Sequence, residues 1–188
     1  MPDDHHPVAD AAVISAEYRA LQAKLHADDP EYGVASLLFA PLVAQVIEQL
    51  AVCDLLDYGA GKCRLAKALP QHSKRGIRYT PYEPAIPEWA APPAPTEMVA
   101  CIDVLEHIEP PCLDAVLDDL RRVVVRVGFF TVHTGRAKRI LADGRNAHLI
   151  QEPPSWWLPK IMARFDLLKF GRAAGGFWVL VAPGAPAR

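Results

Sequence analysis

Residues 55–69, with the sequence LLDYGAGKCRLAKAL, constrain the fold of this 188-residue chain more than any other stretch. A short apolar run reaches Asp57, two glycines follow at Gly59 and Gly61, and a helix-like pattern begins after them. Strand, glycine turn and helix in this order are typical of parallel α/β proteins, in which the turn contacts a ligand. The stretch therefore predicts a ligand-binding loop at the carboxyl end of a parallel strand.

The rest of the chain alternates between helix-like and strand-like patterns. Apolar residues at helical spacing predict helices at 13–26, from Pro41 to residue 50, at 112–124 and, from a Ser155 cap, at 155–165. Short apolar runs predict strands at 76–84, 98–104 and 127–133, and a closing pair that contains DLLKF and FWVLVA. This order predicts an α/β fold with a mainly parallel sheet flanked by helices.

Two stretches lack a regular pattern. Residues 84–95 are rich in proline and cannot form a regular helix, so we expect a surface connection there. Residues 134–154 are polar, basic and irregular, and they follow a strand whose carboxyl end faces the ligand side. Because a loop of this length in a compact domain is usually functional, 134–154 is expected to be the substrate-side loop.

Composition narrows the classes of protein. Apolar residues make up 51% of the chain and charged residues 22%, which is typical of globular proteins. No apolar run reaches the ~18–20 residues that a membrane span needs, and the polar first ten residues are unlike a secretory signal. The four cysteines show neither metal-ligand spacing nor the density of a disulfide scaffold. We therefore expect a cytoplasmic protein with reduced thiols and no metal site.

Charge is distributed unevenly along the chain. Residues 1–120 carry 8 Lys/Arg and 19 Asp/Glu, a balance of −11, whereas residues 121–188 carry 12 and 3, a balance of +9. Two interpretations stay open. The basic half can present a face to an anionic partner, or the two halves can neutralise each other within one fold.

The glycine loop excludes two kinds of nucleotide site. A phosphate-binding P-loop needs an earlier glycine where Leu56 stands and a Ser or Thr where Cys63 stands. A dinucleotide fingerprint needs a third glycine at the position of Arg64. An acid two residues before the first glycine is also unfavourable close to a pyrophosphate. Neither site fits this loop.

S-adenosylmethionine (SAM) fits the loop better, because it carries an ammonium group and no pyrophosphate. Asp57 can hold that ammonium by a charge-assisted hydrogen bond, while Gly59 and Gly61 let the backbone come close to the cofactor. Glu83 ends the next predicted strand, 26 residues after Asp57. A carboxylate at that place accepts hydrogen bonds from both ribose hydroxyls in dinucleotide sites.

Three segments, LLDYGAGKC, YEPA and MVACIDVLEHIEP, together resemble a class I SAM-dependent methyltransferase. They are similar to that family's glycine loop, ribose acid and fourth-strand segment, and the resemblance covers roughly residues 40–135. It implies a Rossmann-like, mainly parallel sheet of the seven-stranded type, with flanking helices and an antiparallel C-terminal strand pair. It also implies one domain over 1–188, in which residues 1–40 form a helical lid.

The resemblance implies a set of cofactor contacts. Asp103 and Val104 lie within the fourth-strand segment, just after its apolar run. The lid offers the side chains of Gln22, His26 and Tyr32, although Tyr32 can equally anchor a turn. Glu106 and His107 are expected to be structural in this position. The implied SAM contacts are Asp57, Gly59, Gly61, Glu83, Asp103, Val104, Gln22, His26 and Tyr32.

Cys63 departs from the family pattern, in which a third small residue, usually glycine, often stands. Cysteine is small and often buried, so we interpret it as tolerated. A reactive thiol at the start of a helix is the alternative.

The substrate-side loop supplies candidates for the acceptor site. His133 and His148 are the candidate general bases, since methyl transfer to a hydroxyl or a protonated amine needs one. In the alternative interpretation, His148 only braces the loop and the tryptophans pack on the sheet. The candidate substrate contacts are Arg136, Arg145, Asn146, Trp156 and Trp157.

The expected function is SAM-dependent O- or N-methylation of a small anionic acceptor, with S-adenosylhomocysteine as the product. Nucleic acid is a less favoured partner, because the segment after the fourth strand lacks the Asn/Asp-Pro-Pro-Tyr/Phe element of amino-directed base methyltransferases. A non-catalytic SAM-binding partner and a SAM-using lyase or cyclase stay open as alternatives. The sequence leaves the oligomeric state and the acceptor open.

Overall fold

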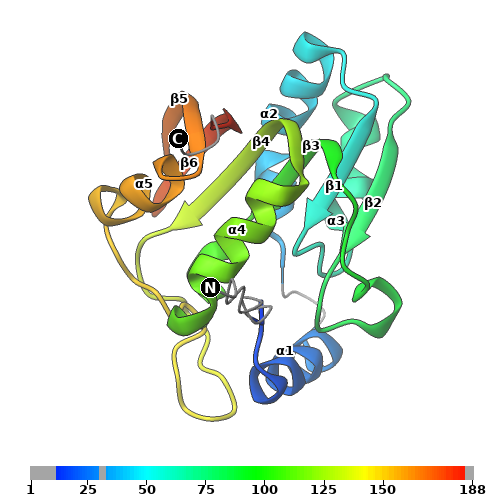
Figure 1. Cartoon of the computed structure of the whole chain (residues 1–188). Helices are drawn as coiled ribbons and strands as arrows, with labels where there is room; N and C mark the ends of the chain where they lie inside the picture. The colour runs from blue at the N-terminus through cyan, green and yellow to red at the C-terminus, as the bar shows by residue number, and fades with distance from the viewer. Residues whose placement is uncertain (1–11, 30–32, 185–188) are drawn as a thin grey trace, which may run out of the picture.

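The computed structural model describes residues 12–29 and 33–184 and contains one mixed sheet (Figure 1). Its strands are β1 (Asp54–Tyr58), β2 (Arg78–Tyr82), β3 (Thr96–Ile102), β4 (Val124–His133), β5 (Phe165–Ala173) and β6 (Gly176–Pro183). The strand order is β2-β1-β3-β4-β6-β5. The first four strands pair in parallel, and β6 is antiparallel to both β4 and β5. The predicted Rossmann-like α/β fold and its C-terminal antiparallel pair are confirmed.

The described sheet has six strands, one fewer than the seven-stranded type. The proline-rich segment after β2 makes one 3-10 turn, η2 (Pro87–Trp89), and leads directly into β3. Prolines cannot donate the hydrogen bonds of a strand ladder, so this segment adds no strand beside β2. As a result β2 forms the edge of the sheet, where its own Pro81 is tolerated.

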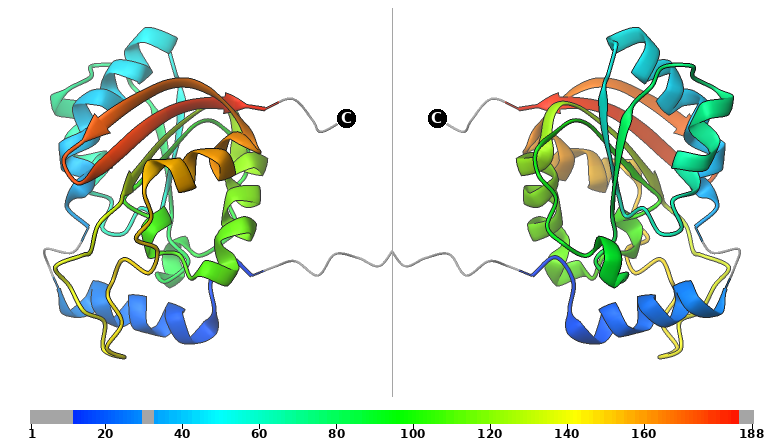
Figure 2. Two further views of the ribbon diagram at one scale, coloured as in Figure 1. Left: turned by 90° about the vertical axis from the view of Figure 1, so that its left-hand side faces the viewer. Right: turned by 90° about the vertical axis from the view of Figure 1, so that its right-hand side faces the viewer.

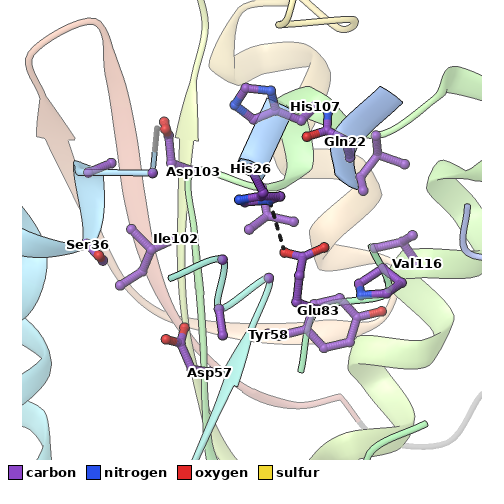
Figure 3. Close-up of a pocket in the computed structure, with 18 of the residues that line it drawn as sticks. Gln22, His26, Ser36, Asp57, Tyr58, Glu83, Ile102, Asp103, His107 and Val116 are labelled. Carbon is purple, nitrogen blue, oxygen red and sulfur yellow. Dashed lines mark ion pairs between the residues drawn. The ribbon is translucent and has the colours of Figure 1, made fainter. Parts of the chain in front are cut away.

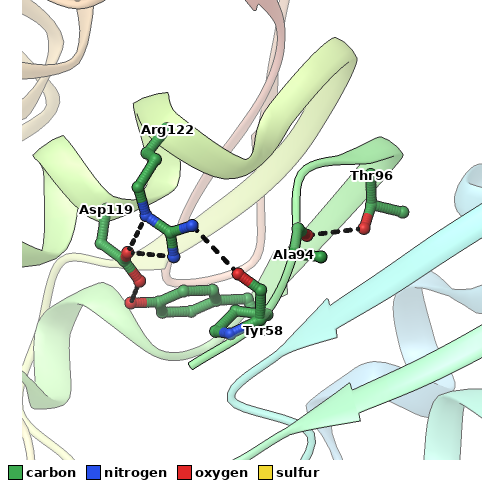
Figure 4. Close-up of polar contacts among 6 residues, drawn as sticks. Tyr58, Ala94, Thr96, Asp119 and Arg122 are labelled. Carbon is green, nitrogen blue, oxygen red and sulfur yellow. Dashed lines mark hydrogen bonds and ion pairs between the residues drawn. The ribbon is translucent and has the colours of Figure 1, made fainter. Parts of the chain in front are cut away.

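The proline-rich connection is fixed by hydrogen bonds to the helix α4 (Leu113–Val123). Arg122 donates to the carbonyl oxygen of Pro93 at 3.0 Å and forms an ion pair with Asp119 (Figure 4). Asp119 also accepts a hydrogen bond of 2.8 Å from the hydroxyl of Tyr58 at the end of β1. Thr96, the first residue of β3, donates to the carbonyl oxygen of Ala94. These contacts hold a segment that has no regular structure of its own.

Helices cover both faces of the sheet. On one face, α2 (Ala35–Leu50) and α3 (Arg64–Ala68) share a core with alternate strand residues such as Leu55 and Met98. On the other face, α4 (Leu113–Val123) and α5 (Pro154–Met162) pack on residues such as Leu56 and Val99. Successive strand residues point to opposite faces, so a strand that is buried on both sides needs a continuous apolar run. The remaining short turns are η1 (Leu69–Gln71), η3 (Leu105–His107) and η4 (Pro110–Cys112).

The helix predicted from residue 13 begins at Ala16, and two predicted helix starts beside prolines were also wrong. The helix expected after Pro41 begins at Ala35, and Pro41 lies inside it. The helix continues past the missing N–H because Ala40 and Val43 are fully buried against the sheet. The last helix begins at Pro154, not at a Ser155 cap; proline fits the first helical position because its nitrogen has no hydrogen to satisfy.

The first helix lies across the carboxyl ends of the parallel strands. This helix, α1 (Ala16–Asp28), is capped by Ser15, whose side chain accepts a hydrogen bond from the backbone N–H of Tyr18. Figure 2 shows α1 beneath the sheet, beside the irregular segment 134–153. The two pack together, because buried Tyr18 forms a small core with Leu141 and Ala147. Together they roof the end of the sheet where the sequence predicted a ligand site.

Ion pairs connect the acidic and the basic parts of the chain. Arg126 pairs with Glu97, Arg139 with Asp29, and Arg164 with both Asp114 and Asp118. These contacts support the interpretation that the two halves neutralise each other within one fold. Among the described helices, none is long and apolar enough to cross a membrane.

Candidate functional site

A pocket opens between α1 and the carboxyl ends of β1, β2 and β3 (Figure 3). It holds about 900 Å³ of atom-free space, including its open mouth. Every predicted cofactor contact in the described part of the chain lines it. These residues are Asp57, Gly59, Gly61, Glu83, Asp103, Val104, Gln22 and His26. Tyr32, the ninth, lies outside the described residues.

The glycine loop needs its glycines for conformation and for packing. Gly59 has φ +82° and Gly61 has φ +49°, a region that side chains with a Cβ adopt rarely. A Cβ at Gly59 would also lie 2.3 Å from a methyl group of Val104, and one at Gly61 would lie 3.2 Å from the His26 ring. Protein neighbours therefore already fill the space beside both glycines, in addition to any approach of a ligand.

Cys63 has a positive φ, like the two glycines before it. Its φ is +52°, so this position also has a left-handed backbone conformation, which favours glycine. Burial raises the pKa of the Cys63 thiol, with an opposing contribution from its hydrogen bond to Tyr79. The thiol is thus kept protonated, which disfavours the reactive-thiol interpretation.

Asp57, the penultimate residue of β1, carries a buried carboxyl group and is only 3% exposed. The Tyr79 hydroxyl donates to its Oδ2 at 2.5 Å. Burial raises the Asp57 pKa to about 7; the Tyr79 hydrogen bond lowers it, and the charge of Glu83 raises it further. A cationic group entering the pocket would favour the ionised form of this carboxyl group.

Glu83 follows β2 and is the second buried acid of the pocket. Its Oε1 accepts from the backbone N–H of Ala85 at 3.2 Å. Burial raises the pKa of Glu83, opposed by the backbone N–H groups of Ala85 and Gly61. Two carboxyl groups in one pocket favour a ligand with cationic or hydroxyl groups and disfavour a phosphate.

The face of α1 that points toward the sheet closes the pocket on the side opposite the strand ends. Gln22 is buried and donates to the Tyr18 hydroxyl at 2.6 Å. His26 lies 3.9 Å from an oxygen of Glu83, and Figure 3 shows its ring between Glu83 and Asp103. Burial, with the nearby charge of Lys62, lowers the His26 pKa to about 4, so the ring is neutral at pH 7.

The end of α1 is attached to both sides of the site. Lys62, in the glycine loop, donates to the Asp29 carbonyl oxygen at 2.5 Å. Arg139, in the substrate-side loop, forms an ion pair with the Asp29 carboxylate. At the other end of α1, Glu109 accepts from the backbone N–H and the hydroxyl of Ser15 at 2.9 and 2.8 Å. We call this set of contacts the α1 clasp.

A cluster of histidines adjoins the pocket at the ends of β3 and β4. His107 lines the pocket, and its ring packs edge-on against that of His148 at 4.8 Å between centroids. His133 lies 4.8 Å from His148 on the other side. Burial lowers the His107 pKa to about 4, opposed by the nearby Asp103 charge. Three imidazoles and a carboxylate thus meet beside the place predicted for the cofactor.

The predicted substrate-side residues lie outside the pocket lining. His133 accepts at Nδ1 from the Gly135 N–H, and its Nε2 packs against Gly175. Asn146 braces its own loop by hydrogen bonds to Ala137. The guanidinium group of Arg145 lies over the Tyr18 ring and pairs with Asp143.

The two tryptophans of α5 have structural surroundings. Trp157 is fully buried in the core between the sheet and the helices α4 and α5, whereas Trp156 is half-buried and carries Lys160 over its ring. This arrangement agrees with the alternative in which the tryptophans pack on the sheet. Arg136 is exposed in the substrate-side loop.

Sequence reasoning missed several pocket residues. The sequence indicates no contact of Tyr18 with a ligand, and it predicts only a structural role for His107. The four-residue spacing of Tyr18, Gln22 and His26 was the available signal, since it places all three on one face of α1. Further lining residues that the sequence did not indicate are Val13, Ser36, Tyr58, Ile108 and Val116.

Comparison with known proteins shows the fold. An N1-methyltransferase of 1,6-didemethyltoxoflavin from Burkholderia thailandensis, solved with that compound and S-adenosylhomocysteine, matches with a TM-score of 0.64 and 17% identity, over 90% of each chain. N-methyltransferase NodS from Bradyrhizobium japonicum, solved with S-adenosylhomocysteine, matches with a TM-score of 0.57 and 9% identity, over 89% of this chain and 99% of NodS. The chain has the fold of these methyltransferases.

Mitomycin 7-O-methyltransferase MmcR is also similar, with a TM-score of 0.62 and 15% identity over 87% of this chain and 60% of MmcR. The similar folds therefore include enzymes named for both O- and N-methylation. No family model and no curated protein sequence matches the chain.

Proposed function

We propose that this protein is a SAM-dependent methyltransferase that acts on a small acceptor. The pair of buried carboxyl groups at adjacent strand ends, Asp57 and Glu83, carries the proposal. That pair suits a ligand with an ammonium group and ribose hydroxyls, and the solved structures of similar fold include enzymes with S-adenosylhomocysteine bound.

In this proposal, each group of pocket residues would contact a different part of the cofactor. Asp57 would accept from the ammonium of the methionine part, and Glu83 from the ribose hydroxyls. Asp103 and Val104 would border the cofactor from β3, and the Gln22 and His26 side chains would cover it from α1.

The chemistry is a displacement at the methyl carbon of the sulfonium. The carbon–sulfur bond breaks as the bond from carbon to the acceptor oxygen or nitrogen forms, and a hydroxyl or ammonium acceptor gives up its proton. The protein must align the two reactants and exclude water, a role that suits the roof of α1 and the substrate-side loop. His148 and His133 remain our candidates to receive the proton.

A small anionic acceptor is the partner that we propose. Arg136 and Arg145 are exposed in the loop that borders the site, and cationic side chains there would attract a carboxylate or a phosphate during approach.

Titration calorimetry with S-adenosylhomocysteine tests the cofactor. We expect saturable binding at one site per chain and a more than tenfold weaker affinity in Asp57→Ala. Glu88→Ala removes an exposed acid from the η2 turn near the pocket and should leave the affinity unchanged. No binding by the folded protein up to millimolar ligand would refute the proposal, as would equal affinity in Asp57→Ala.

Turnover distinguishes the remaining alternatives. With labelled SAM and an extract of small molecules, a methyltransferase produces a labelled acceptor and S-adenosylhomocysteine. A lyase or cyclase would release methylthioadenosine instead. Binding without any turnover across varied extracts would favour a non-catalytic SAM-binding partner.

A further inference from the structure

The histidine cluster has the composition of a metal site. One ligand atom each from Asp103, His107 and His148 lies within 4.8 Å of the other two. Asp103 lies between β3 and the η3 turn, and His107 is the last residue of that turn, whereas His148 comes from the substrate-side loop. Residues so far apart in the chain show no ligand spacing in the sequence, which is why no metal was expected from it.

The two histidines contact backbone carbonyl oxygens through the same ring nitrogen. His107 contacts the Ala147 carbonyl oxygen through Nδ1 at 2.8 Å, and His148 contacts the Gly135 carbonyl oxygen through Nδ1 at 2.7 Å. A carbonyl oxygen only accepts, so Nδ1 carries the proton in each ring and Nε2 keeps its lone pair. Imidazoles that bind metals are oriented by this kind of hydrogen bond from the other nitrogen.

A second carboxyl group lies buried against the cluster. Glu106 is fully buried; its Oε1 accepts from the backbone N–H of His133 at 2.5 Å, whereas its Oε2 has no hydrogen-bond partner among the described residues. A buried oxygen without a partner is costly, and a cation bound beside Asp103 would lower that cost.

We propose that Asp103, His107 and His148 bind one divalent transition-metal ion of the Zn²⁺ class beside the cofactor pocket. Two imidazoles and one carboxylate suit such an ion better than Mg²⁺, which prefers oxygen ligands alone. Metal–ligand bonds of about 2.0–2.2 Å require the three donor atoms to approach each other by roughly 1 Å. Rotation of the half-buried Asp103 side chain can supply part of that movement.

Three protein ligands leave coordination positions open. Asp103 and His107 also line the pocket, so an open position would face the place where the acceptor meets the methyl group. An acceptor with an anionic oxygen could fill that position, and the metal would orient it and hold it deprotonated. In the metal-bound protein His148 would then be a ligand and not the group that receives the proton, because both roles need its Nε2. This role for the acceptor rests on the proposed function, whereas metal binding itself does not.

Equilibrium dialysis of the full chain with Zn²⁺, after treatment with a chelator, tests the site. His5 and His6 are replaced by alanine in every protein, so that this adjacent pair cannot contribute ions. We expect one Zn²⁺ per chain at micromolar concentration and no comparable binding of Mg²⁺. His148→Gln and Asp103→Asn should each weaken Zn²⁺ binding at least 30-fold. Asparagine is chosen at 103 because it tolerates the φ of +59° found there.

The control is His72→Gln, which removes an exposed histidine after the η1 turn and should leave Zn²⁺ affinity unchanged. Thermal unfolding and circular dichroism show that each variant is folded. Absence of stoichiometric Zn²⁺ binding would overturn the proposal, as would equal affinity in His148→Gln and His72→Gln, or a preference for Mg²⁺.

S-adenosylhomocysteine binding is measured on the same variants, to separate this proposal from the previous one. His148 does not line the pocket in the described structure, so His148→Gln should lose Zn²⁺ while it keeps the cofactor product. Loss of metal binding with retained cofactor binding supports the metal site. Zn²⁺ binding by a protein that binds no S-adenosylhomocysteine would refute the proposed function and leave the metal site standing.

Discussion

At the scale of single residues, the Asp57 carboxyl group meets opposing requirements. Burial raises its pKa to about 7, so the ionised form is less favoured in the pocket than in water. An ammonium ligand requires the same ionised form. The folded protein thus holds a proton near neutral pH that cofactor binding would release.

Asp57→Asn should raise stability and reduce cofactor binding. Because the folded-state pKa lies above the unfolded value, the wild-type free energy of unfolding falls as pH rises from about 4 to 7. Asparagine does not ionise, so the variant should be more stable by about 1–3 kcal/mol at pH 8 and equally stable near pH 4. Urea unfolding at both pH values measures this, and calorimetry should show at least tenfold weaker S-adenosylhomocysteine binding. A variant less stable than wild type at pH 8 would contradict the reasoning.

Gly59→Ala should destabilise the glycine loop. The new Cβ meets Val104 at 2.3 Å and must adopt φ +82°, so we expect a loss of about 1–3 kcal/mol in chemical unfolding. Adding Val104→Ala should recover part of the loss, because it removes the clash and leaves only the backbone strain. Gly76→Ala, where a Cβ meets nothing within 4 Å, is the matched control. Equal effects at positions 59 and 76 would exclude the clash.

Single residues also show how far sequence reasoning reached. Asp57, Gly59 and Glu83 could be predicted as neighbours because parallel strands deliver their carboxyl ends to one edge. The contact between Gly59 and Val104 could not be predicted, since it depends on how the end of β3 packs on the loop. Trp157 was expected at a substrate surface, and its burial follows from the angle at which α5 meets the sheet.

At the scale of elements, α1 is a separate piece held over the sheet by contacts at both ends. Its inward residues Tyr18, Gln22 and His26 make up part of the pocket, and its other support is the small core with the substrate-side loop. An element with so few apolar contacts to the main core opens more readily than the strands beneath it.

Glu109→Ala should loosen the start of α1. The substitution removes two hydrogen bonds to Ser15, so amide hydrogens of residues 16–28 should exchange several-fold faster, with S-adenosylhomocysteine affinity about fivefold lower. Hydrogen-exchange mass spectrometry measures the first effect and calorimetry the second. Glu17→Ala removes an exposed acid from the same helix and serves as the control. Unchanged exchange in Glu109→Ala would show that Glu109 does not anchor the helix.

Element existence was more predictable than element boundaries. The alternation of apolar and polar runs predicts the strands and helices. It also predicts a helix start at Pro41, whereas the burial of α2 carries the helix through that proline. The described sheet also lacks the seventh strand of the family type. A seventh strand was expected from the resemblance, but the prolines of 84–95 cannot form a ladder.

At the scale of the whole molecule, charge pairs join segments that are distant in the chain. Arg164, after α5, reaches Asp114 and Asp118 on α4 and also donates to the Asp114 carbonyl oxygen. These contacts fix the end of α5 to the helix layer above the sheet. The uneven charge of the sequence becomes, in the fold, a set of contacts between its two halves.

Arg164→Ala should lower the free energy of unfolding by about 1 kcal/mol, because its two acidic partners are largely exposed and screened by solvent. Urea unfolding at low and high salt measures the effect, which should shrink as salt rises. Arg172→Ala, an exposed arginine on β5, is the comparison. A loss in Arg164→Ala that does not depend on salt would point to lost packing in place of lost charge.

The α1 clasp has a consequence for how fast a cofactor could arrive. Lys62 and Arg139 hold the end of the helix from two sides of the site, while His26 lies against the glycine loop beneath it. We therefore expect a molecule the size of a nucleoside to enter through the pocket mouth mainly when the helix lifts. Its association rate would reach a plateau at high concentration, set by how often the helix lifts and not by how often the two molecules collide.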